Sequence, residues 1–89
     1  MSKRAEEFKS FSDEVLDHID KYTVPQYGDM PNDQVSGMST ADLVTQIKRY
    51  CNRFGNNQRG DVEQLRDFMK MAHYAGMAYY KYKESLNRK

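Results

Sequence analysis

Apolar side chains recur at three- and four-residue steps in three stretches of this 89-residue chain. The first stretch runs from about Arg4 to Tyr22, and its pattern is typical of a helix that packs one face on a core. Its apolar residues are Phe8, Phe11, Val15, Ile19 and Tyr22. Because a residue that precedes proline avoids the helical region, Thr23-Val24-Pro25 is expected to end this helix.

The second stretch begins at Ser39 or Thr40, where Ser39 and Asp42 have the spacing of a capping box. Its apolar residues are Leu43, Ile47, Tyr50, Cys51 and Phe54. Gly55 follows as the expected left-handed stop. Between the first two helices lies the segment VPQYGDMPNDQVSGM, residues 24–38, whose prolines and glycines break any period. The sequence therefore predicts a long irregular connection there.

The third stretch runs from about Val62 to Leu86, with Asp61 as its expected N-cap and Gln64 as the reciprocal partner. Its apolar residues cover well over half of the helix circumference, which predicts packing from two sides. They are Leu65, Phe68, Met69, Ala72, Ala75, Gly76, Tyr79, Tyr80, Tyr82 and Leu86. Glycine inside a helix costs about 0.5–1 kcal/mol relative to alanine, so Gly76 is predicted to lie at a close helix crossing.

These elements predict an all-α fold, a three-helix bundle with a long irregular connection between helices 1 and 2, in a single domain of residues 1–89. Leu, Ile, Val and Phe supply only 15 of 89 residues, so the core is thin, and thin cores are often completed by a second copy. A homodimer is therefore predicted. Tyr74 and Met77 interrupt the polar stripe of the third helix and are predicted to lie at the contact between copies. The alternative is that Tyr27 and Met30 of the connection cover them.

Charge is unevenly distributed along the chain. Residues 1–45 carry four basic and nine acidic side chains, for a net −5, and residues 46–89 carry ten and four, for a net +6. One interpretation is diffuse complementarity between the acidic first helix and the basic later helices. The other is a basic edge that binds an anion or nucleic acid, although the pI of about 7.8 is below the range typical of nucleic-acid domains. The residues of this predicted edge are Arg49, Arg53, Arg59, Arg66 and Lys70.

The sequence offers little catalytic chemistry. It has no phosphate-binding glycine loop and no cysteine pair, since Cys51 is the single cysteine and is expected to be a small buried hydrophobe. We expect no enzyme activity, no cofactor and no metal. A remaining alternative is a metal-dependent nucleotide pyrophosphohydrolase, because Glu14 and Asp17, with Glu63 and Asp67, loosely follow the carboxylate spacing of the all-helical enzymes of that type.

No apolar run approaches the roughly 18 residues of a membrane span, and the first residues, MSKRAEEF, do not form a signal peptide. A cytoplasmic protein without membrane contact is therefore expected. The function that fits these observations is a small non-enzymatic interaction module. A nucleic-acid or nucleotide-binding accessory protein is the first alternative.

The segment IKRYCNRFGNNQRGDVEQLRDFMKMAHY, residues 47–74, resembles short phage and prophage proteins described as nucleotide kinase-like, or SaV-like. In that pattern a helix with Lys-x-Tyr-x-x-Arg runs into a glycine-containing turn, and an acidic, leucine-containing helix follows. The matching positions are Lys48, Tyr50, Arg53, Gly55, Glu63, Leu65, Lys70, Ala72 and Tyr74. The family's aromatic-rich start is missing, and the spacing at residues 70–74 differs. The resemblance implies a small helical phage-type protein, without kinase chemistry.

Overall fold

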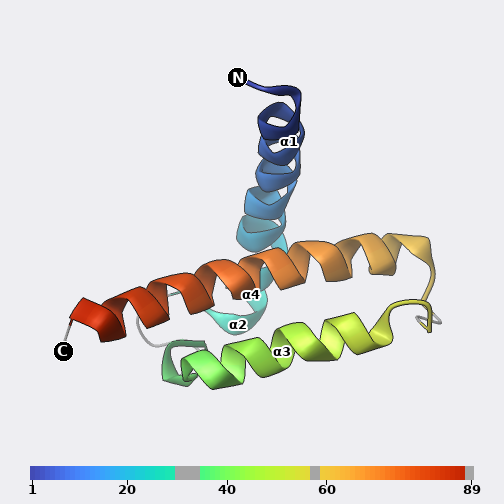
Figure 1. Cartoon of the computed structure of the whole chain (residues 1–89). Helices are drawn as coiled ribbons and strands as arrows, with labels where there is room; N and C mark the ends of the chain where they lie inside the picture. The colour runs from blue at the N-terminus through green and yellow to red at the C-terminus, as the bar shows by residue number, and fades with distance from the viewer. Residues whose placement is uncertain (30–34, 57–58, 88–89) are drawn as a thin grey trace. The chain divides into compact units, whose positions relative to one another are not determined.

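The computed structural model of the chain describes residues 1–29, 35–56 and 59–87. These residues form helices and turns and no strand, which confirms the predicted all-α class (Figure 1). The chain divides into two compact units, Met1–Ser36 and Gly37–Lys89. Three of the helices are long, and they match the three predicted stretches. The first belongs to the first unit and the other two form the second.

The first unit consists of α1 (Lys3–His18), the π-helical turn η1 (Ile19–Thr23) and α2 (Val24–Tyr27). Ser2 caps α1 by accepting a hydrogen bond from the Ala5 N–H at 3.1 Å. Within the apolar stripe predicted for the first stretch, Val15 of α1 is buried, whereas Phe8 of α1 and Tyr22 of η1 are exposed.

The prediction that Thr23-Val24-Pro25 ends the first helix is wrong, because the helical backbone continues to Tyr27. Pro25 has no N–H, and its ring crowds the carbonyl group four residues earlier. The π-helical turn widens the backbone just before the proline, and the Val24 N–H donates to the Ile19 carbonyl five residues back. The chain leaves the helix at Gly28, whose φ is 93°.

The predicted connection, residues 24–38, is therefore helical at its start. It also contains a short 3₁₀ turn, η2 (Val35–Gly37). Residues 30–34, including Met30, lie outside the described residues.

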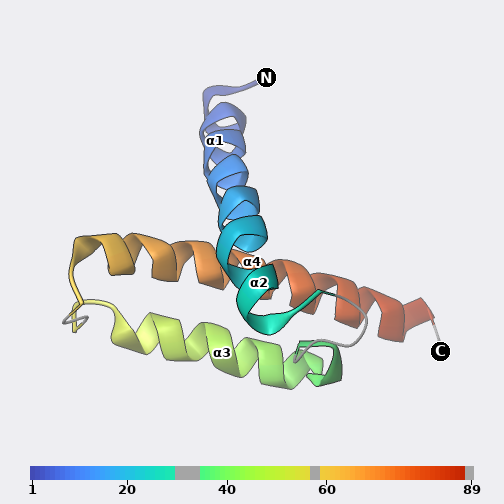
Figure 2. The same cartoon turned by 180° about the vertical axis from the view of Figure 1, so that it is seen from behind.

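The second unit is a hairpin of α3 (Thr40–Arg53) and α4 (Asp61–Asn87), which pack against each other. The two helices lie side by side in both views of the fold (Figures 1 and 2). The capping box of α3 is confirmed, since the Asp42 N–H donates to Ser39 Oγ at 3.1 Å and the Ser39 N–H to Asp42 Oδ2 at 2.9 Å. Gly55 follows α3 with a φ of 83°, as predicted for the left-handed stop.

The third predicted helix is confirmed, but it begins one residue earlier than expected. Asp61 is its first residue, and the Gln64 N–H donates to the Gly60 carbonyl oxygen at 3.1 Å. Gly60, with a φ of 97°, therefore occupies the cap position that the sequence had suggested for Asp61. Its missing side chain makes this conformation accessible.

The face of α4 that packs on α3 differs from the predicted one. Asp67 is fully buried, and Met71 and Tyr74 contact residues of α3. Asp67 and Tyr74 lie on the stripe that the sequence indicated as polar. Most of the apolar stripe faces away from α3, and most of its large side chains are exposed, although the ring of Phe68 lies 6.1 Å from the ring of Phe54 at the end of α3. Gly76 has no atom within 4 Å of the position a Cβ would take, so the prediction of a close helix crossing there is wrong.

Candidate functional site

The seam between α3 and α4 is centred on Tyr50, which is buried on α3 together with Leu43. The ring of Tyr50 stacks on the ring of Tyr74, with centroids 6.0 Å apart. Arg53 and Lys70 lie over the same ring, with Cζ and Nζ at 5.3 and 5.7 Å from its centroid. Cations in these positions are attracted by the ring's negative face, so Tyr50 holds an aromatic and two basic side chains together.

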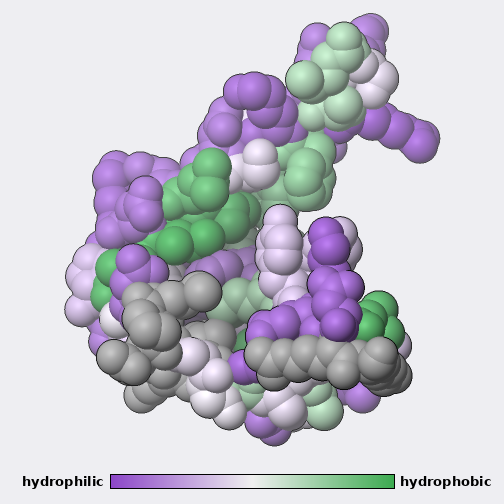
Figure 3. Space-filling model, turned by 90° about the vertical axis from the view of Figure 1, so that its left-hand side faces the viewer, coloured by the Kyte–Doolittle hydropathy of each residue, from purple (hydrophilic) through white to green (hydrophobic). Residues whose placement is uncertain are grey.

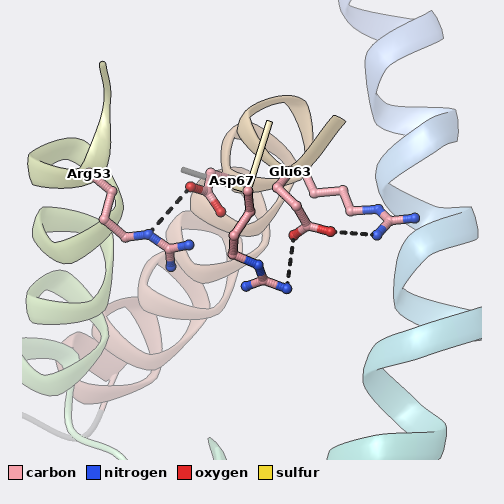
Figure 4. A network of polar contacts seen from close by, with 5 residues as sticks. Arg53, Glu63 and Asp67 are labelled. Carbon is pink, nitrogen blue, oxygen red and sulfur yellow. Dashed lines mark hydrogen bonds and ion pairs between the residues drawn. The ribbon is translucent and has the colours of Figure 1, made fainter. Parts of the chain in front are cut away.

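Asp67 lies at the start of α4 with its side chain fully buried, and its Oδ2 is 3.7 Å from Arg53 Nε on α3 (Figure 4). A carboxylate out of water requires a compensating charge or hydrogen bonds. Arg53 supplies that charge across the seam, and two-thirds of its own side chain is shielded from solvent. The pair thus ties the end of α3 to the start of α4. The sequence had suggested Asp67 only as one of the carboxylates of the pyrophosphohydrolase alternative.

Glu63 lies one turn before Asp67 and faces two arginines. Its Oε1 is 2.8 Å from Arg66 Nη1, and its Oε2 is 3.5 Å from Arg59 Nη2 (Figure 4). Partial burial opposes ionisation of this carboxyl group. The hydrogen bond from Arg66 and the charges of Arg59, Arg66 and Lys70 outweigh that effect and lower the pKa of Glu63. Glu63 is therefore a stable anion within a basic group.

The structure brings four of the five predicted basic residues into this region. Arg53 pairs with Asp67, Arg59 and Arg66 pair with Glu63, and Lys70 lies over Tyr50. The fifth, Arg49, donates from Nη1 to Gln46 Oε1 on its own helix at 2.9 Å. Residues 53–70 also include Asp61, so four positive and three negative side chains leave this region with a net +1. A phosphate would have to compete there with two carboxylates.

The predicted interface residues occupy different environments. Tyr74 faces Tyr50 of its own chain, and Met77 is partly exposed. A role for them between copies stays a prediction. Cys51, expected to be buried, is exposed instead, and its Sγ lies 3.6 Å from Met71 Sδ at the edge of the seam. Cys51 is exposed because Leu43 and Tyr50 point into the seam while Cys51 lies beside it.

Sequence analysis gave no binding role to the side of α4 that points away from α3. We call this side the outer face of α4. Its five large side chains are between 43% and 64% exposed. Exposed hydrophobic residues are visible at the molecular surface in Figure 3. The outer face consists of Leu65, Phe68, Ala72, Ala75, Tyr79, Tyr82 and Leu86.

The described parts of the chain give no support for a metal site or a membrane span. No group of three or more His, Cys, Asp or Glu side chains there is placed to hold a metal ion. Three of the four carboxylates of the pyrophosphohydrolase alternative face cations, since Asp17 lies 3.0 Å from Lys21 and both Glu63 and Asp67 pair with arginines. No helix in the same residues has the length and apolar character needed to cross a membrane.

Comparisons of the chain with protein-family models, with curated proteins and with solved structures found no match. The resemblance of residues 47–74 to short phage proteins therefore stays a prediction.

Proposed function

We propose that this protein is a small non-enzymatic interaction module and that the outer face of α4 is its binding surface. The observation that carries the proposal is the exposure of five large apolar or aromatic side chains along one side of α4. They are Leu65, Phe68, Tyr79, Tyr82 and Leu86. Single exposed apolar residues are ordinary on a protein surface, whereas a contiguous group of this size is typical of an interaction site.

The chemistry of the face supports a protein partner. Aromatic residues are enriched at the centres of protein interfaces, where charged residues are depleted. No acidic or basic residue is among the seven residues of the outer face, although Lys83 Nζ lies 5.7 Å from the centroid of the Tyr79 ring. Arg59 and Arg66 pair with Glu63, and Arg53 pairs with Asp67, elsewhere in the unit. A partner with an apolar helical surface would remove the exposed rings from water without leaving a charge unpaired.

A photo-crosslinking residue at position 79 tests this proposal in the intact protein. The matched control carries the same residue at Lys48, which is exposed on α3. The supporting result is one discrete protein adduct at position 79, identified by mass spectrometry and reproduced with the purified components, that is missing at position 48. Equal labelling at both positions, or no adduct at either, would contradict a specific surface on α4.

A further inference from the structure

The residues of the outer face follow a seven-residue repeat. Leu65, Ala72, Tyr79 and Leu86 stand at intervals of seven, and Phe68, Ala75 and Tyr82 each stand three residues after one of them. This is the spacing of the a and d positions of a coiled coil. In the same frame, the residues that face α3, Asp67, Met71 and Tyr74, occupy other positions. The repeat thus describes a second packing surface, which the hairpin leaves largely exposed, with Phe68 in contact with Phe54 at the end of α3 and still 43% exposed.

We propose that a second copy of the chain occupies this face, with the two α4 helices antiparallel. This inference rests on the proposed function. In that orientation an a position of one helix faces a d position of the other. One register then places Phe68 opposite Leu86, Ala72 opposite Tyr82 and Ala75 opposite Tyr79 of the second copy. Each layer occurs twice around a two-fold axis near residue 77.

The sizes of the side chains favour this antiparallel register. Each alanine is opposite a tyrosine, so the layers have similar width and the rings fill the space above the small residues. A parallel pair would instead place Ala72 on Ala72 and Tyr79 on Tyr79. Two thin layers would then lie between thick ones, and the helices could not close around the alanines. The layers thus discriminate between the two orientations.

The exposed area is sufficient for a dimer of modest affinity. A whole aromatic side chain covers about 150–250 Å², so the exposed parts of the five large side chains amount to roughly 400–500 Å² per copy. Two copies would bury about 1,000 Å², which is the lower limit of a specific interface. Gly76 lies beside the two-fold axis, and no atom beyond its own helix backbone lies within 4 Å of the position that a Cβ would take. A second helix can therefore approach closely at the centre.

Sedimentation velocity over a wide concentration range tests whether a second copy of the chain occupies the outer face. The wild type should change from monomer to dimer as concentration rises. Tyr79→Glu places a charge within a layer and should keep the protein monomeric. Tyr80→Glu is the matched control, because Tyr80 is a neighbouring exposed tyrosine outside the layers, and it should dimerise as the wild type does. Circular dichroism is the control for folding, and both variants should remain helical. A wild type that stays monomeric at every concentration, or equal effects of the two substitutions, would overturn the proposal.

Cysteine crosslinking tests the orientation in a Cys51→Ser background, which removes the exposed native thiol. Phe68→Cys and Leu86→Cys are made in separate chains. Positions 68 and 86 are about 27 Å apart along a helix, so each should form little disulfide alone and a covalent dimer when the two are mixed. Efficient crosslinking of either variant with itself would overturn the antiparallel arrangement. If the photo-crosslink at position 79 identifies only a different protein, the proposed function stands and the second copy is rejected.

Discussion

At the residue scale, Gly55 has a backbone conformation that favours glycine, whereas Gly76 has an ordinary helical one. Gly55 has a φ of +83° after α3, a conformation that costs other residues about 1–2 kcal/mol. Gly76 lies within α4 with open space around it. An added methyl group would therefore meet nothing at Gly76 within one chain and would be strained at Gly55.

We expect Gly76→Ala to raise the free energy of unfolding by about 0.5–1 kcal/mol, because alanine is the better helix former. Gly55→Ala should lower it by about 1–2 kcal/mol. Urea unfolding at a protein concentration that keeps the chain monomeric measures both. If Gly76→Ala destabilised the monomer, a neighbouring group would have to lie close to that position, contrary to the geometry.

The pair of Arg53 and the buried Asp67 provides a second prediction at this scale. Arg53→Met keeps much of the side-chain volume but removes the charge that faces Asp67. Losing one partner of a buried pair is costly, and partial exposure of Arg53 reduces the effect, so we expect about 1–3 kcal/mol of destabilisation. Adding Asp67→Leu should recover a large part of that loss. A double-mutant cycle by urea unfolding measures the coupling, and additive effects would show that the pair contributes nothing.

At the scale of elements, the start of α3 depends on an ionised Asp42. The Ser39 backbone N–H donates a hydrogen bond to this carboxylate. That hydrogen bond lowers the pKa of Asp42 below its ordinary value of 3.8, and the Ser39 side chain and the charge of Lys81 lower it further. A carboxyl group with a lowered pKa stabilises the folded state above its unfolded pKa, and this contribution is lost as pH falls through the folded pKa.

We therefore expect the wild type to lose stability below about pH 4 more steeply than Asp42→Asn, which has no carboxylate to protonate. Thermal unfolding between pH 7 and pH 2 gives the two profiles. Ser39→Ala removes the other half of the box and should cost about 1 kcal/mol at neutral pH. Parallel acid profiles of wild type and Asp42→Asn would show that the capping carboxylate does not control this part of the pH dependence.

The ends of α3 were predictable because local chemistry determines where this helix begins and ends, whereas the helical backbone of the first unit continues past Pro25 to Tyr27. The Ser39–Asp42 box and Gly55 mark both ends of α3, and each depends on residues close in sequence. The side of α4 that packs on α3 was not predictable from apolar character alone. Large apolar residues occupy the outer face, while the seam uses Tyr74 and the buried Asp67. The choice of this side depends on Tyr50 and Arg53, whose partners Tyr74 and Asp67 lie 24 and 14 residues later in the chain.

The predicted basic site could be only partly derived from the sequence, again because it depends on which side of α4 packs on α3. Clustering of the basic residues follows from their helical spacing, and four of them do gather near residues 53–70. Their pairing with Glu63 and Asp67 depends on which side of α4 meets α3. The seven-residue repeat of the outer face was present in the sequence. Its significance became visible only once the other side of α4 was known to be occupied.

At the scale of the whole molecule, the formal net charge is +1, and the basic group at residues 53–70 is partly neutralised by its own carboxylates. Affinity for nucleic acid falls with salt in proportion to the number of phosphates neutralised. A protein with these pairs should therefore bind a generic oligonucleotide weakly and with a shallow salt slope.

Glu63→Gln tests this balance, because it removes the carboxylate that both Arg59 and Arg66 contact and raises the net charge by one. We expect tighter binding of a generic oligonucleotide at low salt and a steeper slope of log K against log salt, measured by fluorescence anisotropy. The control is Arg49→Ala with Arg59→Ala, which leaves the Arg53–Asp67 pair intact. It should leave the weak wild-type binding nearly unchanged. A steep wild-type slope that this double substitution flattens by about two units would instead identify the basic residues as a nucleic-acid site.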